Sequence, residues 1–160
     1  MKTAICPGSF DPITLGHLDI IRRAAAIFPK VIVAVMVNSK KTGLFSVEER
    51  VELIKRAVKD MPNVTVESSN ALLAHWAEEK GDCVLVKGLR AISDFESEFQ
   101  MALINRKLNP KLETVFLPTS DEYLYLSSSI VREVCSLGGD ITDFVPKEIL
   151  QDVKQKLARG

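Results

Sequence analysis

The sequence has few cysteines and no long apolar run, and each of these absences excludes a class of protein. Its three cysteines, Cys6, Cys83 and Cys135, are widely spaced and form no Cys-x-x-Cys pair. Such a set fits neither a disulfide framework nor a zinc site and favours a reducing compartment. The longest unbroken apolar run, Val31–Val37, is far shorter than the roughly 18 residues of a membrane span. The N-terminal segment is interrupted too early for a secretory signal. We therefore expect a cytoplasmic protein without a membrane partner.

The sequence also lacks an excess of charge of either sign. It has 21 Lys and Arg residues against 21 Asp and Glu residues, and 46% of its residues are hydrophobic. This composition excludes a disordered chain and argues against a broad nucleic-acid-binding surface, which needs a basic face. The balance does not exclude a small, locally basic pocket for a phosphate-bearing molecule. The length of 160 residues predicts one domain, residues 1–160.

Short runs rich in β-branched residues alternate along the chain with segments of helical periodicity. The runs that we predict as strands are Thr3–Cys6, Val31–Val37, Val64–Glu67, Cys83–Val86 and Thr114–Leu117. Most are nearly continuous in apolar residues, which is typical of strands covered on both faces. The alternation predicts an α/β fold, a single-domain, Rossmann-like, open parallel sheet of five strands with helices on both faces.

The predicted helices have recognisable starts and ends. Ser46 and Glu49 have the spacing of a capping box, which predicts that a helix begins there. Further helices are predicted by apolar stripes and by the glycines and prolines that follow or precede them; they include Leu18 to Phe28, Leu72 to near Gly81, Phe95 to Arg106, Ile130–Leu137, and a last one from Pro146.

Ligands of open parallel sheets bind outside the carboxyl ends of the strands. The segment after the first predicted strand, Pro7–His17, is neither a dinucleotide fingerprint nor a P-loop. It contains Thr14-Leu15-Gly16-His17 instead. Gly16 removes a side chain where a ligand approaches closely, and His17 is expected in the first turn of a helix, where the backbone attracts anions.

Four ordered motifs together resemble one known family. Gly8-Ser9-Phe10-Asp11-Pro12 with Thr14-Leu15-Gly16-His17 is similar to the first motif of the Thr/His-x-Gly-His nucleotidyltransferases. Three further stretches narrow the resemblance to the phosphopantetheine adenylyltransferase family; they are the stretch from Lys41 to Ser46, Lys87-Gly88-Leu89-Arg90 with Asp94-Phe95-Glu96 and Glu98, and Leu126–Glu133. The resemblance implies transfer of the adenylyl group of ATP to 4′-phosphopantetheine, giving dephospho-coenzyme A and pyrophosphate in coenzyme A biosynthesis.

The resemblance also implies roles for particular residues. His17 would stabilise the transition state, and Lys41 and Arg90 would complete the catalytic set. The residues expected to bind ATP are Ser9, Phe10, His17, Gly88, Leu89, Arg90, Glu98, Tyr123, Leu124, Tyr125, Leu126, Ser127, Ser128 and Ser129. Those expected to bind phosphopantetheine are Ser9, Lys41, Leu73 and Lys87. Lys87 departs from the family pattern, which has Arg there; a lysine keeps the charge but loses the bidentate fork. Ser97 stands where an aromatic residue is frequent.

The expected reaction needs no general base from the protein. A phosphate monoester has a second pKa of about 6, so the attacking phosphate is already mostly a dianion at neutral pH. We expect Mg²⁺ to arrive with ATP and to be held by phosphates and water, because no Asp/Glu cluster forms a dedicated metal site. The resemblance further implies a homohexamer and a site at which coenzyme A could act as a feedback ligand.

Two other hypotheses remain open from the sequence. One is a relative with a different acceptor, such as a nicotinate mononucleotide adenylyltransferase or a cytidylyltransferase. The other is a module that senses ATP without turning it over, against which the combination of Thr14, His17 and Arg90 speaks. The acceptor side of the pocket, with Lys41, Leu73 and Lys87, is where different acceptors are expected to be distinguished.

Overall fold

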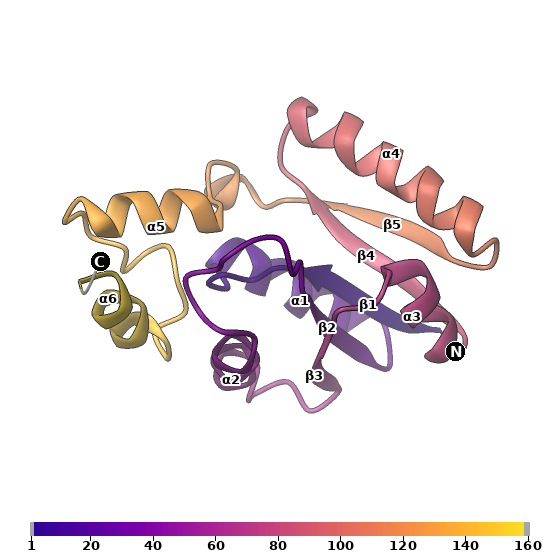
Figure 1. Cartoon of the computed structure of the whole chain (residues 1–160), viewed down its shortest axis with the longest axis horizontal. Helices are drawn as coiled ribbons and strands as arrows, with labels where there is room; N and C mark the ends of the chain where they lie inside the picture. The colour runs from indigo at the N-terminus through magenta and orange to yellow at the C-terminus, as the bar shows by residue number, and fades with distance from the viewer. Residues whose placement is uncertain (1, 159–160) are drawn as a thin grey trace.

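A computed structural model of the chain describes residues 2–158, apart from the side chains of residues 92–93. Five parallel strands form one sheet in the order β3-β2-β1-β4-β5. The strands are β1 (Thr3–Gly8), β2 (Val31–Met36), β3 (Val64–Ser69), β4 (Cys83–Leu89) and β5 (Glu113–Pro118). The α/β prediction is confirmed, with β1 at the centre of the sheet (Figure 1).

Helices connect successive strands, as the alternation in the sequence predicts. They are α1 (Leu15–Ile27), α2 (Val47–Ala57), α3 (Leu73–Glu79), α4 (Ile92–Leu108), the 3-10 helix η1 (Asp121–Tyr123), α5 (Ser128–Ser136) and α6 (Leu150–Ala158). The predicted capping box of α2 is present, because the Ser46 side chain accepts from the Glu49 amide and the Glu49 carboxylate accepts from the Ser46 amide. The last helix begins later than expected, since a turn in which Ile149 N–H donates to Pro146 O precedes α6.

The sheet separates two apolar clusters, because successive side chains of each strand point to opposite faces. Ala4 and Cys6 belong to one cluster with residues of α1, α2, α5 and α6. Ile5 lies between them in the sequence and belongs to the other cluster, which includes α3 residues such as Trp76. Helices therefore cover both faces of the sheet, as predicted. In the part of the chain that the structure describes, no helix is long and apolar enough to span a membrane.

Several strands continue beyond their predicted ends because the hydrogen-bonded ladder continues. Gly8 still pairs with Val35, and Leu89 with Pro118. Lys87 and Gly88 therefore lie in β4 and not in the loop after it. At Gly88 a side chain would not fit, because a Cβ there would approach Cγ1 of Ile20 on α1 to 2.8 Å. This close contact fixes the distance between β4 and α1, the two elements that flank the candidate site.

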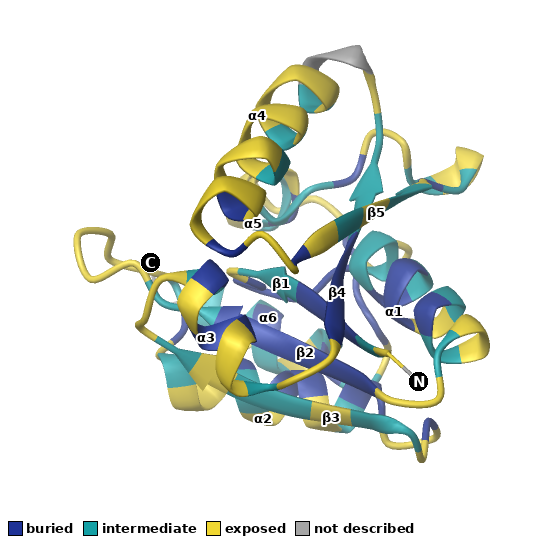
Figure 2. Cartoon of the chain, turned by 90° about the vertical axis from the view of Figure 1, so that its right-hand side faces the viewer, coloured by how far each residue is buried: buried dark blue, intermediate teal, exposed yellow. Residues whose placement is uncertain are grey.

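The helix α4 packs differently from the others. Its apolar residues Phe95, Phe99 and Leu103 are about half exposed, and Phe95 stacks on Phe99 with ring centroids 5.5 Å apart. Figure 2 shows exposed residues along much of this helix, which lies to one side of the sheet. The predicted helix is present, but its apolar stripe does not contribute to the core.

Candidate active site

A cavity of about 820 Å³ opens at the carboxyl ends of β1 and β4. The strand order changes direction between these two strands, which is where open α/β sheets bind their ligands. Residues from the loops after β1, β2, β4 and β5 line it. The predicted site residues that line it are Ser9, Phe10, His17, Lys41, Lys87, Gly88, Arg90, Glu98, Tyr123, Leu126, Ser127, Ser128 and Ser129.

Four of the predicted site residues do not line this cavity. Leu73 begins α3 and packs against the apolar cluster on the other face of the sheet. Leu89 lies at the end of β4, where it pairs with Pro118. Leu124 and Tyr125 are exposed, and the Tyr125 ring packs on Phe144. These four residues are therefore separate from the group that the cavity brings together.

His17 is the third residue of α1, and its ring state is set by the residue that caps this helix. The Thr14 amide donates to Nδ1 of His17 over 3.0 Å, and the His17 amide donates to Oγ1 of Thr14 over 3.3 Å. Because Nδ1 accepts a hydrogen bond from a backbone N–H, the network assigns the proton of the neutral ring to Nε2. Burial, together with the nearby positive charge of Arg90, lowers the pKa of His17 to about 4. The ring is thus neutral at pH 7 and can donate from Nε2.

Arg90 follows β4 and is held in place from two sides. Its Nε and Nη2 donate to the two oxygens of Asp94 over 2.9 and 3.1 Å, and its Nη1 donates to the carbonyl of Leu126 over 2.8 Å. The hydrogen bonds from Arg90 hold the pKa of Asp94 below its usual range. An arginine has five N–H donors, so two remain, one on each Nη atom. Arg90 is therefore oriented before any ligand arrives.

Two lysines add positive charge to the cavity. Nζ of Lys87 lies 2.7 Å from Oε2 of Glu98, which stands on α4. Lys41 lies in the exposed loop between β2 and α2 and has no ion pair within residues 2–158. One lysine is thus oriented by a carboxylate, and the other is available to a ligand.

The N-terminus of α5 forms another wall of the cavity. Ser127 caps the helix, since its side chain accepts from the Ile130 amide over 3.2 Å. Ser128 Oγ donates to the carbonyl of Pro12 over 2.7 Å, and Ser129 Oγ accepts from Nη2 of Arg132 over 3.3 Å. Only Ser128 uses its O–H as a donor in these contacts, so the hydroxyls of Ser127 and Ser129, together with the amides at this helix end, are suited to meet an anion.

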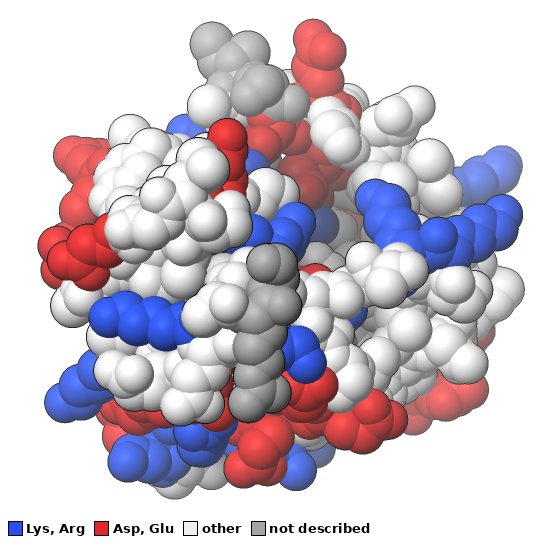
Figure 3. All heavy atoms as spheres, turned by 60° about the vertical axis from the view of Figure 1, so that its left-hand side comes forward, with Lys and Arg blue, Asp and Glu red and all other residues white. Residues whose placement is uncertain are grey.

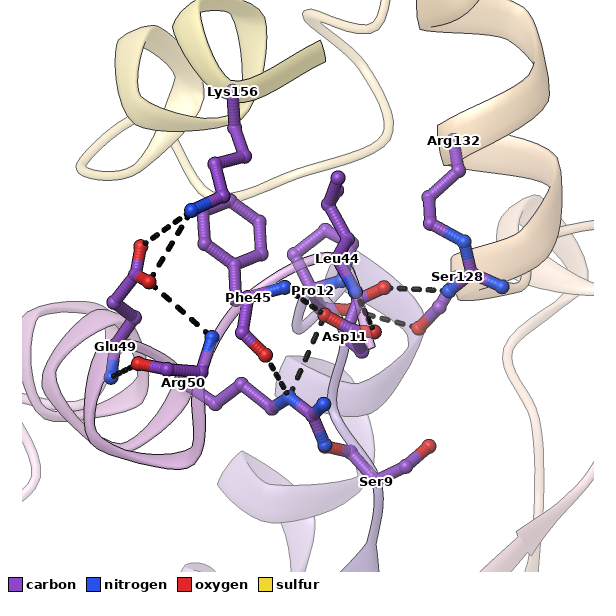
Figure 4. A network of polar contacts seen from close by, with 11 residues as sticks. Ser9, Asp11, Pro12, Leu44, Phe45, Glu49, Arg50, Ser128, Arg132 and Lys156 are labelled. Carbon is purple, nitrogen blue, oxygen red and sulfur yellow. Dashed lines mark hydrogen bonds and ion pairs between the residues drawn. The ribbon is translucent and has the colours of Figure 1, made fainter. Parts of the chain in front are cut away.

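Sequence reasoning gave no role to Asp11 and Arg50, which form a buried ion pair beside the cavity (Figure 4). Nε of Arg50 lies 3.5 Å from Oδ1 of Asp11. Arg50 is a charged residue on the inward stripe of α2, between Val47 and Ile54, and this anomaly is the signal that could have identified it. Arg132 was also missed; its Nη1 donates to the carbonyl of Asp11 over 2.6 Å.

The charges that line the cavity favour an anionic ligand. Five basic side chains, Lys41, Arg50, Lys87, Arg90 and Arg132, face three acidic ones. Each of the three carboxylates has a basic partner, namely Arg50, Arg90 or Lys87. The positive charge is local, because the whole chain has 21 basic and 21 acidic residues, and on the face that Figure 3 presents Lys and Arg are mixed with Asp and Glu. The cavity is therefore suited to bind phosphate groups, although the protein surface as a whole is not basic.

Two other chemical features of the site are relevant to its reactivity. Cys6 lies at the floor of the cavity, and burial raises the pKa of its thiol to about 12, so it is not a nucleophile at neutral pH. Among the residues that the structure describes, no group of three or more His, Cys, Asp or Glu side chains could hold a metal ion.

Comparison with known proteins identifies close relatives over almost the whole chain. A family model described as cytidylyltransferase-like matches residues 5–134. A phosphopantetheine adenylyltransferase of Clostridium tetani is 56% identical over 156 residues, which cover 98% of both chains. A protein of the same name from Clostridium botulinum is 57% identical over 157 residues, covering 98% of this chain and 96% of the relative.

Solved structures with much lower identity share the fold. A bifunctional NMN adenylyltransferase/ADP ribose pyrophosphatase from Francisella tularensis aligns with a TM-score of 0.70 and 15% identity, covering 99% of this chain and 49% of that one. A protein assigned as a nicotinate-nucleotide adenylyltransferase from Vibrio parahaemolyticus aligns with a TM-score of 0.67 and 19% identity, covering 99% and 93%. At these identities the likeness concerns the fold alone.

Proposed function

This chain belongs to the phosphopantetheine adenylyltransferase family, and from that premise we propose that the cavity between β1 and β4 is where it transfers the adenylyl group. The activity is that of the family, transfer of the adenylyl group of ATP to 4′-phosphopantetheine in coenzyme A biosynthesis. The observation that carries the assignment of the site is a neutral imidazole in an otherwise basic cavity, with its Nε2 proton free to donate.

The acceptor phosphate supplies its own nucleophile. Because its second pKa is about 6, a phosphate monoester is mostly dianionic at pH 7, so no residue has to remove a proton. One of its oxygens attacks the α-phosphorus of ATP, a new P–O bond forms, and the bond to the β-phosphate oxygen breaks. Pyrophosphate leaves with the electron pair of that bond, and dephospho-coenzyme A remains. The protein has to bring two polyanions together and stabilise the charge that develops at the α-phosphate.

His17 is suited to the stabilising role. Its neutral ring can donate a hydrogen bond from Nε2 to a non-bridging oxygen of the α-phosphate, because the Thr14 amide occupies Nδ1. Its position in the first turn of α1 adds the field of the helix N-terminus, which favours negative charge. In the transition state this donor gains strength as charge accumulates on the phosphate oxygens.

The cations divide between the two substrates. Arg90 and the N-terminus of α5 are joined by the hydrogen bond from Arg90 to the Leu126 carbonyl, and we assign them to the phosphates of ATP. Glu98, Gly88, Ser9 and Phe10 complete the expected nucleotide contacts. Lys41 and Lys87 are assigned to the phosphate of phosphopantetheine, with Ser9 between the two substrates. Leu73 remains an expected contact of phosphopantetheine. Leu89, Leu124 and Tyr125 remain expected contacts of ATP.

Mg²⁺ is proposed to enter with ATP as part of the substrate. The carboxylates of the cavity each have a basic partner, so they do not form a ready set of metal ligands. Oxygen atoms of the triphosphate and water are the ligands that Mg²⁺ prefers in such sites. Titration of activity with Mg²⁺ at fixed ATP tests this assignment.

The product and coenzyme A are expected to occupy the same acceptor side of the cavity. Both carry the pantetheine chain, so coenzyme A would act as a feedback ligand that competes with phosphopantetheine. Inhibition that is competitive with phosphopantetheine and relieved in a Lys87→Ala variant supports this role. Inhibition unaffected by acceptor concentration contradicts it.

We propose that residues 1–160 act as one domain, in the cytoplasm, within a homohexamer. The continuous sheet and the bidentate contact of Arg56 on α2 with Asp152 on α6 support a single cooperative unit. The free thiols Cys6, Cys83 and Cys135 suit a reducing compartment. The exposed apolar stripe of α4 supports self-association, because soluble monomers rarely expose large apolar patches.

A direct assay tests the proposed function. The protein is incubated with ATP, Mg²⁺ and 4′-phosphopantetheine, and pyrophosphate release is measured beside parallel reactions with nicotinate mononucleotide. We expect release with phosphopantetheine only. Release only with the other acceptor, or binding of ATP without release, contradicts the assignment.

A further inference from the structure

The loop that carries Lys41 has one turn of its own, in which the Lys41 amide donates to the Asn38 carbonyl and the Lys40 amide donates to Oδ1 of Asn38, each over 3.1 Å. Residues 38–43, between β2 and α2, are exposed and form neither strand nor helix. Burial begins only at Phe45, next to the cap of α2. This local turn does not attach the exposed loop to the rest of the molecule, so a lysine that is to meet a phosphate at a defined place also needs contacts from elsewhere.

Asp11 supplies those contacts. Its Oδ2 accepts the Leu44 amide over 2.8 Å, and its Oδ1 accepts the Phe45 amide over 2.9 Å. Asp11 comes from a different loop, the one after β1, and its side chain is only 8% exposed. One carboxylate thus fixes two consecutive peptide groups of the loop, three and four residues after Lys41.

Arg50, on α2, completes this network of contacts. Its Nε donates to the Phe45 carbonyl over 3.0 Å, its Nη1 donates to the Ser9 carbonyl over 3.4 Å, and its positive charge balances Asp11. Gly43 lies against the guanidinium so closely that a Cβ there would overlap Nη2. Figure 4 shows the loop after β1, the loop before α2 and α2 itself meeting at this pair.

We infer that Asp11 and Arg50 are positioning residues for the reaction, which hold the Lys41 loop at the place where the acceptor phosphate binds. The inference rests on the proposed function of Lys41. A buried ion pair alone is weak evidence for stability, since well-packed apolar residues often serve as well. Asp11 does what an apolar residue cannot do, because its two oxygens orient two backbone amides of the neighbouring loop.

Asp11→Asn is the sharpest change. The amide has one acceptor oxygen, and its NH₂ group would face a backbone N–H, so one of the two loop amides loses its partner. We expect kcat/KM for phosphopantetheine to fall about 10²-fold, the loss that a misplacement of about 1 Å can cause. The KM for ATP should change little, because the contacts of Arg90 and α5 are untouched.

The decisive measurement is the double variant with Lys41→Ala. If Asp11 acts through Lys41, Asp11→Asn adds almost nothing to the loss already caused by Lys41→Ala. Losses that multiply overturn the inference while leaving the role of Lys41 intact. A Lys41→Ala enzyme with unchanged kinetics overturns both the inference and the proposed role of Lys41.

Two further variants separate positioning from folding. Gly43→Ala keeps the carboxylate but displaces the loop from Arg50, and it should repeat the selective loss in kcat/KM even where Asp11→Asn does not fold. Lys156→Gln is the matched control, because Lys156 contacts the same region at the Phe45 ring and Glu49, on the exposed side. We expect unchanged kinetics for this control. A comparable loss in Lys156→Gln, or full activity in folded Gly43→Ala, contradicts the inference.

Discussion

At the scale of single residues, His17 owes its chemical state to its neighbours more than to its own side chain. The Thr14 amide keeps Nδ1 as an acceptor, and the Phe10 ring packs against the imidazole in a T-shaped arrangement with a centroid distance of 5.0 Å. Arg90 adds a positive charge that opposes protonation of the ring. The residue therefore acts as a neutral donor, which is what a phosphate oxygen that gains charge requires.

His17→Ala tests this role. Loss of one oriented donor to a developing charge typically lowers kcat about 10²–10³-fold. The Thr14 side chain still caps α1, but the buried Thr14 amide loses Nδ1 as its acceptor, so we expect a modest fall in melting temperature with the fold retained. His75→Ala is the matched control, because the side chain of the other histidine is exposed on α3. Near-normal turnover in folded His17→Ala would contradict the assigned role.

The protonation of His17 can be followed directly by NMR of its ring nitrogens. The folded pKa of about 4 lies below the ordinary value of 6.5, so the unfolded chain binds the additional proton between these pH values. The stabilising contribution of the neutral ring is present above about pH 6.5 and is lost as the pH falls towards 4. We expect an Nε2–H tautomer down to near that pH and a higher pKa in Arg90→Gln. A titration of His17 near 6.5 in the folded protein would be inconsistent with this environment.

The sequence could predict site residues that stand in short motifs near the ends of strands. It could not predict those whose role depends on a partner far away in the chain. His17, Lys87 and Arg90 stand in short motifs at such ends, and they line the cavity. Asp94 was visible in a motif, but its contact with Arg90 depends on how α4 leaves β4. Asp11 gains its partner Arg50 only when β1 and α2 come together, and no local pattern specifies that contact.

At the scale of elements, β4 and α4 work as a pair. The ladder with β5 extends β4 beyond its apolar run and so places Lys87 and Gly88 on a rigid strand. α4 returns over this end and brings Glu98 to Lys87. The ion pair orients the lysine, which lacks the planar fork of an arginine.

Lys87→Ala should affect the two substrates unequally. Because Lys87 is assigned to the acceptor phosphate, we expect the KM for phosphopantetheine to rise more than the KM for ATP. Lys87→Arg keeps the charge and restores the fork, so it should retain acceptor binding. Initial rates with each substrate varied in turn provide the measurement, and equal losses for both substrates would show that the allocation is wrong.

The sequence predicted the existence of α4 but not its surroundings. An apolar periodicity identifies a helix face, and it does not identify what covers that face. Phe95, Phe99 and Leu103 have the spacing of a buried stripe, yet they are 48%, 47% and 54% exposed. The strand ends were underestimated for a related reason, since ladder hydrogen bonds continue through polar residues such as Lys87.

At the scale of the whole molecule, the strand order explains why one end of the sheet carries the chemistry. With β1 beside β4, the loops after both strands face the same opening, and α5 closes it from a distant part of the sequence. The parallel α/β class could be predicted from the alternation of patterns alone. The order of the strands could not, because it depends on pairing between segments far apart in the chain.

Self-association through α4 is testable by light scattering coupled to size exclusion. Phe99→Glu places a charge in the exposed stripe formed by Phe95, Phe99 and Leu103 and should convert the assembly from six copies to smaller species. Leu137→Glu is the matched control, since Leu137 is 80% exposed at the end of α5. A monomeric wild-type protein, or a Phe99→Glu assembly of unchanged size, would contradict the proposed interface.

The contact between Asp94 and Arg90 affects the entropy change when a nucleotide binds. Restricting a long, flexible arginine to one rotamer costs up to about 1.5–2 kcal/mol in lost conformational entropy. Here that loss is incurred when the chain folds, because Asp94 and the Leu126 carbonyl already immobilise the guanidinium. The incoming triphosphate meets a rigid surface, and more of its contact energy remains as affinity.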